Sequence, residues 1–104
     1  MAKSDTAERP LVFALAQPIQ AHDEQIKELK LREPTSLDLI EVGSPVRIDV
    51  ADPSKIAHDE RRMAQMIARL GDIPPSSVQT LAISDFTKIS WVLTPFFARG
   101  LFEI

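Results

Sequence analysis

The chain has 104 residues, of which 44% are hydrophobic and 26% are charged, as expected of one globular domain with a single core. It contains no cysteine, which excludes disulfides, thiolate catalysis and cysteine-held metals. The formal net charge of −3 argues against long-range attraction to nucleic acid or anionic lipid, so we expect a protein partner.

The first ten residues, MAKSDTAERP, are polar and show no periodicity. We therefore expect residues 1–10 to form a flexible tail and residues 11–104 to form the folded domain. The apolar run from Leu11 to Ala16 is too short for the core of a signal peptide, and no stretch approaches the roughly 18 apolar residues of a membrane span. The sequence predicts a soluble protein.

Two segments with alternating apolar residues predict an N-terminal β-hairpin. The residues expected to face the core are Leu11, Phe13, Leu15 and Ile19 in the first segment, and Leu29 and Leu31 in the second, Gln25 to Arg32. Pro18 cannot donate to a ladder and should lie at an edge or near a strand end. For these residues to share a face, opposite positions must sum to an even number, which favours a loop of three or five residues. The connecting residues, Ala21 to Glu24, include no glycine for a positive φ angle.

A short helix should follow the hairpin. Pro34 ends the second strand, and Thr35 with Asp38 three residues later is typical of a capping box, which predicts a helix from Ser36 to about Val42. Gly43, Pro45 and Pro53 then indicate a linker, within which the alternation of three apolar residues allows a brief strand: Val46, Ile48 and Val50.

From Ser54 the apolar period becomes helical and predicts a long helix. Its apolar stripe comprises Ile56, Met63, Met66, Ile67 and Leu70, with Ala57, Ala64 and Ala68 beside it. Gly71 is expected at the position after the helix end, where a left-handed conformation is common. Pro74 and Pro75 should begin another short helix that reaches about Leu81.

The last predicted helix is capped by Ser84. Its apolar stripe comprises Phe86, Ile89, Leu93, Phe96 and Phe97. Pro95 removes one backbone hydrogen bond, so the helix should either kink near Trp91 or end by Thr94 and restart. The sequence thus predicts an α+β fold, with a small N-terminal β-hairpin followed by a mainly α-helical domain of three to four helices.

Residues suited to catalysis are few. His22 falls in the hairpin loop, and His58 is expected in the first turn of the long helix, beside Asp59 and Glu60, on a solvated polar face. Helix neighbours one or two positions apart do not face each other, so a metal site is not indicated. There is no Gly-x-Ser-x-Gly elbow, and the three glycines are too far apart for a phosphate loop. We expect no catalytic, cofactor-binding or metal-binding residues and no enzymatic activity.

An alternative function is a small helix-turn-helix DNA-binding regulator. Residues 56–70, the turn 71–75 and residues 76–82 have the outline of that motif. The second segment, SSVQTLA, carries no Lys or Arg, although a recognition helix normally needs cations and base-reading groups. A structural helical corner is the favoured interpretation.

Five of the six aromatic residues lie in the last nineteen residues. Phe86, Ile89 and Leu93 should fill the core, but the remaining apolar side chains cannot all lie on that stripe. An exposed apolar patch usually marks a protein interface, for self-association or for an extended partner. The candidate protein-binding residues are Trp91, Phe96, Phe97, Leu101, Phe102 and Ile104.

Several blocks together resemble the tail assembly chaperones of Mu-like prophages. They lie between about Leu11 and Phe97: the hairpin, the run LKLREPTSLDL from Leu29 to Leu39, the run IARL from Ile67 to Leu70 followed by Ile73-Pro74, and Leu81 to Phe86 with Asp85 before the last helix.

The resemblance implies a non-enzymatic protein without cofactors, made in the host bacterial cytoplasm and absent from the mature virion. Such chaperones are thought to coat the tape measure protein before tube subunits polymerise around it, and are often extended by a ribosomal frameshift. The implied partners are the tape measure protein and further copies of the chain, with no nucleic acid, membrane or small-molecule substrate.

Overall fold

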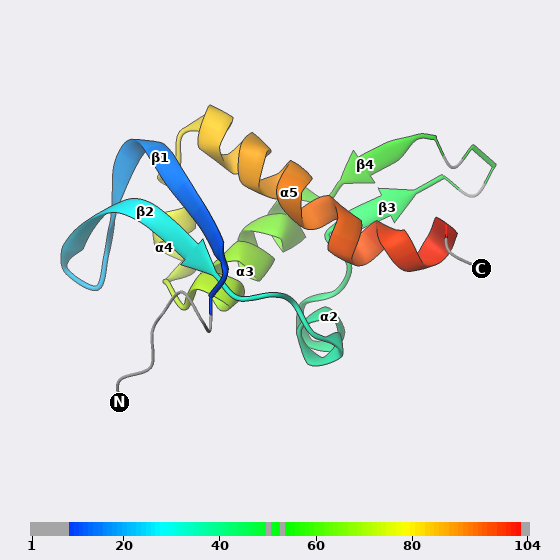
Figure 1. Cartoon of the computed structure of the whole chain (residues 1–104), viewed down its shortest axis with the longest axis horizontal. Coiled ribbons are helices and arrows are strands. Elements are labelled where there is room, and N and C mark those ends of the chain that lie inside the picture. Colours follow the sequence, from blue (N-terminus) through cyan, green and yellow to red (C-terminus); the bar gives the residue numbers. More distant parts are fainter. Residues whose placement is uncertain (1–8, 50, 53, 103–104) are drawn as a thin grey trace.

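The computed structural model describes residues 9–102 apart from Val50 and Pro53, with side chains as far as Ala98. The predicted tail thus lies almost wholly outside the described residues. The elements in chain order are β1 (Leu11–Ala21), β2 (Glu24–Leu31), α2 (Ser36–Val42), β3 (Val46–Ile48), β4 (Ile56–His58), α3 (Glu60–Gly71), α4 (Pro75–Val78) and α5 (Ile83–Phe102). The β1–β2 hairpin lies at one end of the molecule and the β3–β4 pair toward the other, with α5 running between them (Figure 1). The predicted α+β class is confirmed.

The hairpin turns through two residues, His22 and Asp23, so the predicted loop of three or five residues is wrong. Both turn residues have a positive φ, 54° and 62°. Such a turn follows the twist of the strands, and His and Asp adopt positive φ more readily than most residues other than glycine. His22 also donates through Nε2 to the carbonyl of Asp72 at 2.8 Å, which holds the turn against the end of α3.

The alternation requires opposite residue numbers to sum to an even number. An irregularity in β1 produces this pairing, and the turn does not. Phe13 lies opposite Leu29, whereas Ile19 lies opposite Ile26. The last regular pair before the shift is Ala14 with Glu28, so residues 15–18 of β1 face Lys27 alone. Phe13 and Ile19 nevertheless both point into the core, as predicted.

Asp85, in the first turn of α5, satisfies the backbone of this irregular stretch. Its buried carboxylate accepts from the backbone N–H of Ala16 at 3.0 Å and of Gln17 at 3.3 Å. These donors have no strand partner, and Pro18 beside them has no N–H to offer. The start of α5 is thereby joined to the hairpin.

A second antiparallel pair, β3 and β4, corrects the predicted start of the long helix. Ile48 lies opposite Ile56 and Val46 opposite His58. The predicted brief strand is confirmed over Val46–Ile48, and Val50 lies outside the described residues. Ile56–His58 is a strand, however, and α3 begins only at Glu60. The predicted helix began too early because Ile56 precedes Met63 by seven residues. That spacing corresponds to two helical turns, so Ile56 fits the apolar stripe of the helix although it lies in a strand.

The helix α3 packs closely on the hairpin at its C-terminal end. Gly71 is the last helical residue, and the left-handed residue after it is Asp72, with φ 54°, so the position predicted for Gly71 is off by one. A Cβ atom on Gly71 would lie 2.9 Å from Cδ2 of Leu31. Glycine is therefore required there for the close approach to β2, rather than for positive φ.

Two further helix boundaries differ from the predictions. The helix α4 ends at Val78, well short of Leu81. The helix α5 begins at Ile83, so Ser84 lies inside its first turn and is not the cap. It also continues through Pro95 without ending at Thr94.

One apolar cluster joins the hairpin to α3, α4 and α5. Ile89 and Leu93 of α5 are fully buried and Phe86 packs against the cluster, as predicted. The fully buried side chains of α3 are Met63, Met66, Ile67 and Leu70. The core thus leaves α2 and the outer face of α5 at the surface.

Candidate functional site

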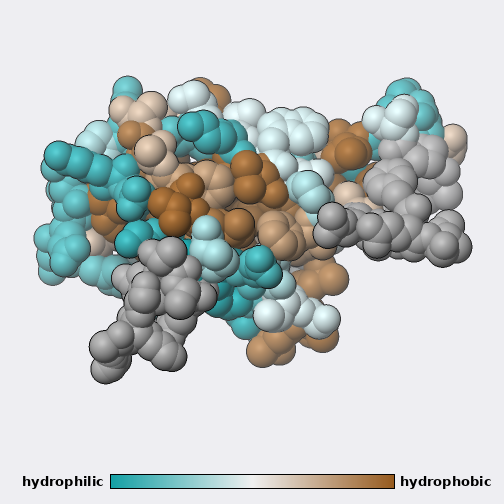
Figure 2. Space-filling model, in the orientation of Figure 1, coloured by the Kyte–Doolittle hydropathy of each residue, from teal (hydrophilic) through white to brown (hydrophobic). Residues whose placement is uncertain are grey.

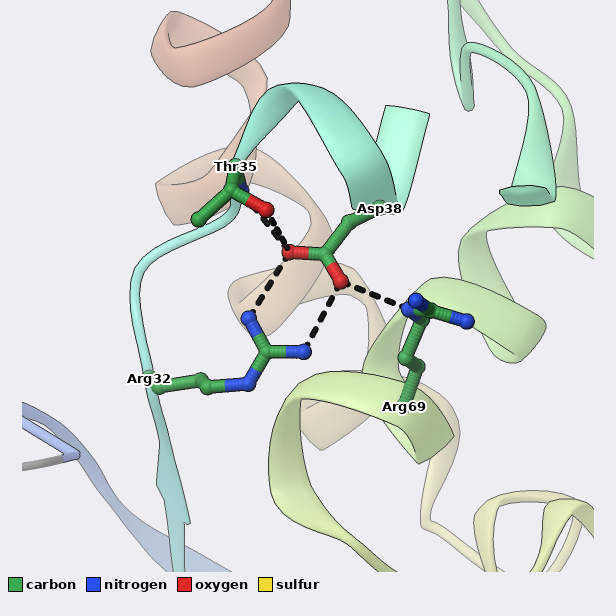
Figure 3. A network of polar contacts seen from close by, with 4 residues as sticks. All are labelled: Arg32, Thr35, Asp38 and Arg69. Atoms are coloured by element: carbon green, nitrogen blue, oxygen red, sulfur yellow. Dashed lines mark hydrogen bonds and ion pairs between the residues drawn. The ribbon is translucent and has the colours of Figure 1, made fainter. Parts of the chain in front are cut away.

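A buried carboxylate fixes the position of α2. Asp38 is the only buried residue of this helix. Arg32 donates from its two terminal nitrogens to the two oxygens of Asp38, each at 2.8 Å, and Nε of Arg69 donates at 2.6 Å (Figure 3). The backbone N–H of Thr35 donates to the same carboxylate at 2.7 Å and its hydroxyl at 3.0 Å, so the predicted capping box is confirmed. We refer to Arg32, Thr35, Asp38 and Arg69 as the Asp38 clamp.

The clamp is a structural device rather than an acid–base pair. Hydrogen bonds from Arg32 hold the pKa of Asp38 well below its ordinary value, and those from Arg69 and Thr35 add to this against the opposing effect of burial. The same contact raises the pKa of Arg32. Because both oxygens of Asp38 are occupied by charged donors, the carboxylate stays ionised and joins the ends of β2 and α3 to α2.

With its polar residue inside, α2 presents apolar residues to solvent. Ile40, roughly 200° around the helix from Asp38, is 76% exposed. Leu37 is 57% exposed and Leu39 40%. The orientation is the reverse of an ordinary surface helix, in which the apolar stripe faces the core.

The predicted interface residues near the C-terminus divide into three groups. Trp91 and Phe96 are substantially exposed, and Val92 lies between them at the surface. Phe97 is half-buried and packs against the core. The side chains of the remaining three candidates lie outside the described residues: Leu101, Phe102 and Ile104.

The apolar residues of the two helices meet at a hollow of about 190 Å³, lined in part by Leu39, Phe96 and Phe97. Apolar colour extends along the lower edge of the molecule over α2 (Figure 2). We define the apolar band as six exposed side chains of these helices, of which Leu39 and Phe96 line the hollow: Leu37, Leu39 and Ile40 of α2, and Trp91, Val92 and Phe96 of α5. The sequence predicted exposed Trp91 and Phe96 as interface residues but did not include Val92 or the α2 residues, although an aspartate flanked by leucines in a capping box was an available signal for α2.

His58 does not lie on a solvated helix face as predicted. It ends β4, its Nε2 is hydrogen-bonded to the hydroxyl of Thr94 at 2.8 Å, and its ring meets Trp91 edge-on with centroids 4.7 Å apart. Thr94 donates to the carbonyl of Ser90, so His58 is the donor in this contact. The contact orients Trp91 at the edge of the apolar band.

Neighbouring acidic residues do not form a metal centre with His58. Asp59 is the N-cap of α3, and the backbone N–H of Arg62 that it accepts at 3.1 Å lowers its pKa. Within the described part of the chain, no three His, Asp or Glu side chains lie close enough together to hold a metal ion.

The helix-turn-helix outline is not realised. The helix α4 has four residues, a single turn, and two of them, Ser77 and Val78, are buried. Ser77 donates to the carbonyl of Gln20 in β1 at 2.6 Å, so α4 faces the hairpin and not a groove of DNA. This supports the interpretation as a structural corner.

The fold and surface define a small α+β protein that presents apolar side chains on two adjacent helices. Residues 12–98 match the family model described as "Phage tail assembly chaperone proteins, E, or 41 or 14". The match covers most of the chain, so the chain belongs to this family, and the resemblance is confirmed. Searches of curated proteins and of solved structures give no match. None of the helices described is long and apolar enough to cross a membrane.

Proposed function

We propose that this protein binds the tape measure protein of its phage during tail morphogenesis, as a non-enzymatic chaperone in the host cytoplasm. Membership of the tail assembly chaperone family is the observation that carries the proposal. The apolar band supports it, because a group of exposed large apolar side chains is characteristic of protein-binding sites.

The chemistry of the polar groups is consistent with a binding role. Among the described residues, the two buried carboxylates are Asp38 and Asp85, and their oxygens accept from arginine and backbone donors. Both therefore position helices, which is a structural role and not that of a general base.

The physical demands on such a chaperone are modest. A tape measure protein is long, helical and prone to aggregate until the tail tube surrounds it. A protein that protects it needs apolar contacts that are weak and reversible, multiplied by many copies along the client. We assign the client contacts to Trp91 and Phe96, and self-association of the chaperone to Leu101, Phe102 and Ile104. Phe97 packs against the core and is left out of this assignment.

Co-expression with the tape measure protein from the same phage tests the proposal. We expect the wild-type chain to keep the tape measure protein soluble and to co-purify with it, and Phe96→Asp to abolish both effects. Thr87→Asp, at an exposed position of the same helix, is the matched control and should behave as wild type. A tape measure protein that aggregates equally with and without the wild-type chain would contradict the proposal.

A further inference from the structure

We propose that the α2 half of the apolar band is a docking surface for one amphipathic helix of the partner, which lies across α2 and α5. This inference rests on the proposed function and specifies the surface and the form of the partner. Its starting point is the Asp38 clamp. An aspartate in place of the usual apolar contact, held by two arginines from other elements, has the effect of keeping Leu37 and Ile40 in solvent.

The extent of the exposed surface indicates the size of the occupant. The exposed parts of the six side chains of the apolar band amount to an area on the order of a few hundred Å², comparable to the largest patch of a typical monomer. A stable dimer needs roughly 800 Å² from each copy. A second copy of this chain would therefore have to bury polar surface well beyond the band, whereas one face of a helix covers the band itself.

The hollow between the two helices supplies a site for an anchoring side chain. It is bounded on one side by Pro34, Thr35, Ser36 and Leu39 and on the other by Phe96 and Phe97. A leucine or phenylalanine of a partner helix would fill it. The neighbouring residues of that helix, three or four positions away, would then contact Ile40 on one side and Val92 on the other.

Charges beside the band specify the flanks of the partner helix. Glu41 lies next to Leu37 on the wheel of α2 and is exposed, as is Glu33 just before the helix. The guanidinium groups of Arg32 and Arg69 are turned toward Asp38. Lys88, exposed one turn before Trp91 and Val92 on α5, carries the opposite charge, so the complementary partner helix has lysine or arginine on the flank that lies over α2.

Overlapping helical fragments of the tape measure protein, fused to a soluble carrier and titrated by fluorescence anisotropy, test this inference. For the fragment that binds wild type most tightly, Ile40→Asp should raise Kd more than about tenfold, the loss expected of a contact at the centre of an interface. Ile83→Asp is the control, because Ile83 is 85% exposed at the far end of α5. It should leave Kd unchanged.

The charge assignment has its own pair of variants. Glu41→Lys should weaken binding of the same fragment, whereas Glu28→Lys, exposed on β2, should not. Thermal melts should show unchanged midpoints for all four variants, since each replaces an exposed side chain.

The possible failures are distinguishable. If a fragment binds wild type and Ile40→Asp equally, α2 is not the docking surface, while the proposed function stands. If Ile40→Asp dissociates an oligomer of the free chain in sedimentation velocity, the occupant is a second copy and the inference is wrong. If no fragment binds and the intact tape measure protein is not kept soluble, both the proposed function and this inference fail.

Discussion

Asp38 is the residue on which the position of α2 depends. Replacing it with asparagine keeps the size of the side chain but leaves two arginine charges without a counter-ion. We expect Asp38→Asn to lower the free energy of unfolding by about 2–4 kcal/mol, which is less than the roughly 3–5 kcal/mol typical of breaking a fully buried ion pair. The reduction reflects the solvent access of the arginines, whose side chains are 35% and 33% exposed. Urea melts measure the loss, and Glu28→Gln on the hairpin surface, expected to cost nothing, is the control.

The same residue predicts a dependence of stability on pH. Because folding lowers the pKa of Asp38, its contribution is fully present above the pKa of an unfolded aspartate, about 3.9, and is lost as pH falls through the lower value of the folded state. The stability difference between wild type and Asp38→Asn should therefore be constant from pH 7 to about 5 and narrow below about 4. A difference that already narrows between pH 7 and 5 would show that another group is responsible.

Substitution of Gly71 tests how closely α3 approaches the hairpin. Alanine has the higher helix propensity by about 1 kcal/mol, but its Cβ would lie 2.9 Å from Cδ2 of the fully buried Leu31. Overpacking of this kind costs about 1–3 kcal/mol, so we expect Gly71→Ala to be destabilising on balance. In a Leu31→Val background, which lacks the δ carbons, the same change should become neutral or stabilising. Urea melts of the four proteins form the double-mutant cycle.

Among elements, the hairpin turn carries measurable strain. His22 and Asp23 both hold positive φ angles, a conformation that glycine adopts without cost. Asp23→Gly should therefore raise the free energy of unfolding by about 0.5–1 kcal/mol, because two-residue turns of this type favour glycine at the second position. His22 is left in place since its ring binds the carbonyl of Asp72. An unchanged or lower unfolding midpoint in urea would mean that the side chain of Asp23 has a stabilising role.

Local signals in the sequence sufficed for some elements and not for others. Thr35 and Asp38 lie three residues apart, so their capping box and the bounds of α2 could be predicted. Arg69 lies 31 residues beyond Asp38, and no local pattern announces that contact. The strand β4 was missed because three residues are too few for an alternation to outweigh a helical period.

The hairpin register shows a different limit. The parity argument correctly required Phe13 and Leu29 to share a face, but it assigned the adjustment to the turn. The structure places it in β1, where Asp85 provides acceptors for the unpaired N–H groups. Asp85 is about 70 residues away in sequence. The unpaired N–H groups of the irregular strand therefore obtain their acceptor only in the tertiary fold, and no local sequence pattern could indicate it.

At the scale of the whole molecule, the candidate site arises where two helices distant in sequence come together. The concentration of aromatic residues indicated that α5 has an exposed side, because one helix face cannot bury them all. The hollow that joins Phe96 to Leu39 could not be predicted, since it depends on the Asp38 clamp turning α2 outward. Adjacent phenylalanines of α5 consequently have different environments.

Because of this difference, the same substitution at Phe96 and at Phe97 should affect different properties: binding at Phe96 and stability at Phe97. Phe97 is half-buried against the core, so Phe97→Asp should lower the free energy of unfolding by about 2 kcal/mol or more. Phe96 is 43% exposed, so Phe96→Asp should change the free energy of unfolding by less than about 0.5 kcal/mol. The same change should nevertheless abolish co-purification with the tape measure protein. Urea melts and pull-downs on the same preparations measure both quantities. Equal destabilisation by the two changes would place Phe96 in the core and remove it from the apolar band. A stable Phe96→Asp protein that still binds the tape measure protein would show that other residues of the band make the contact.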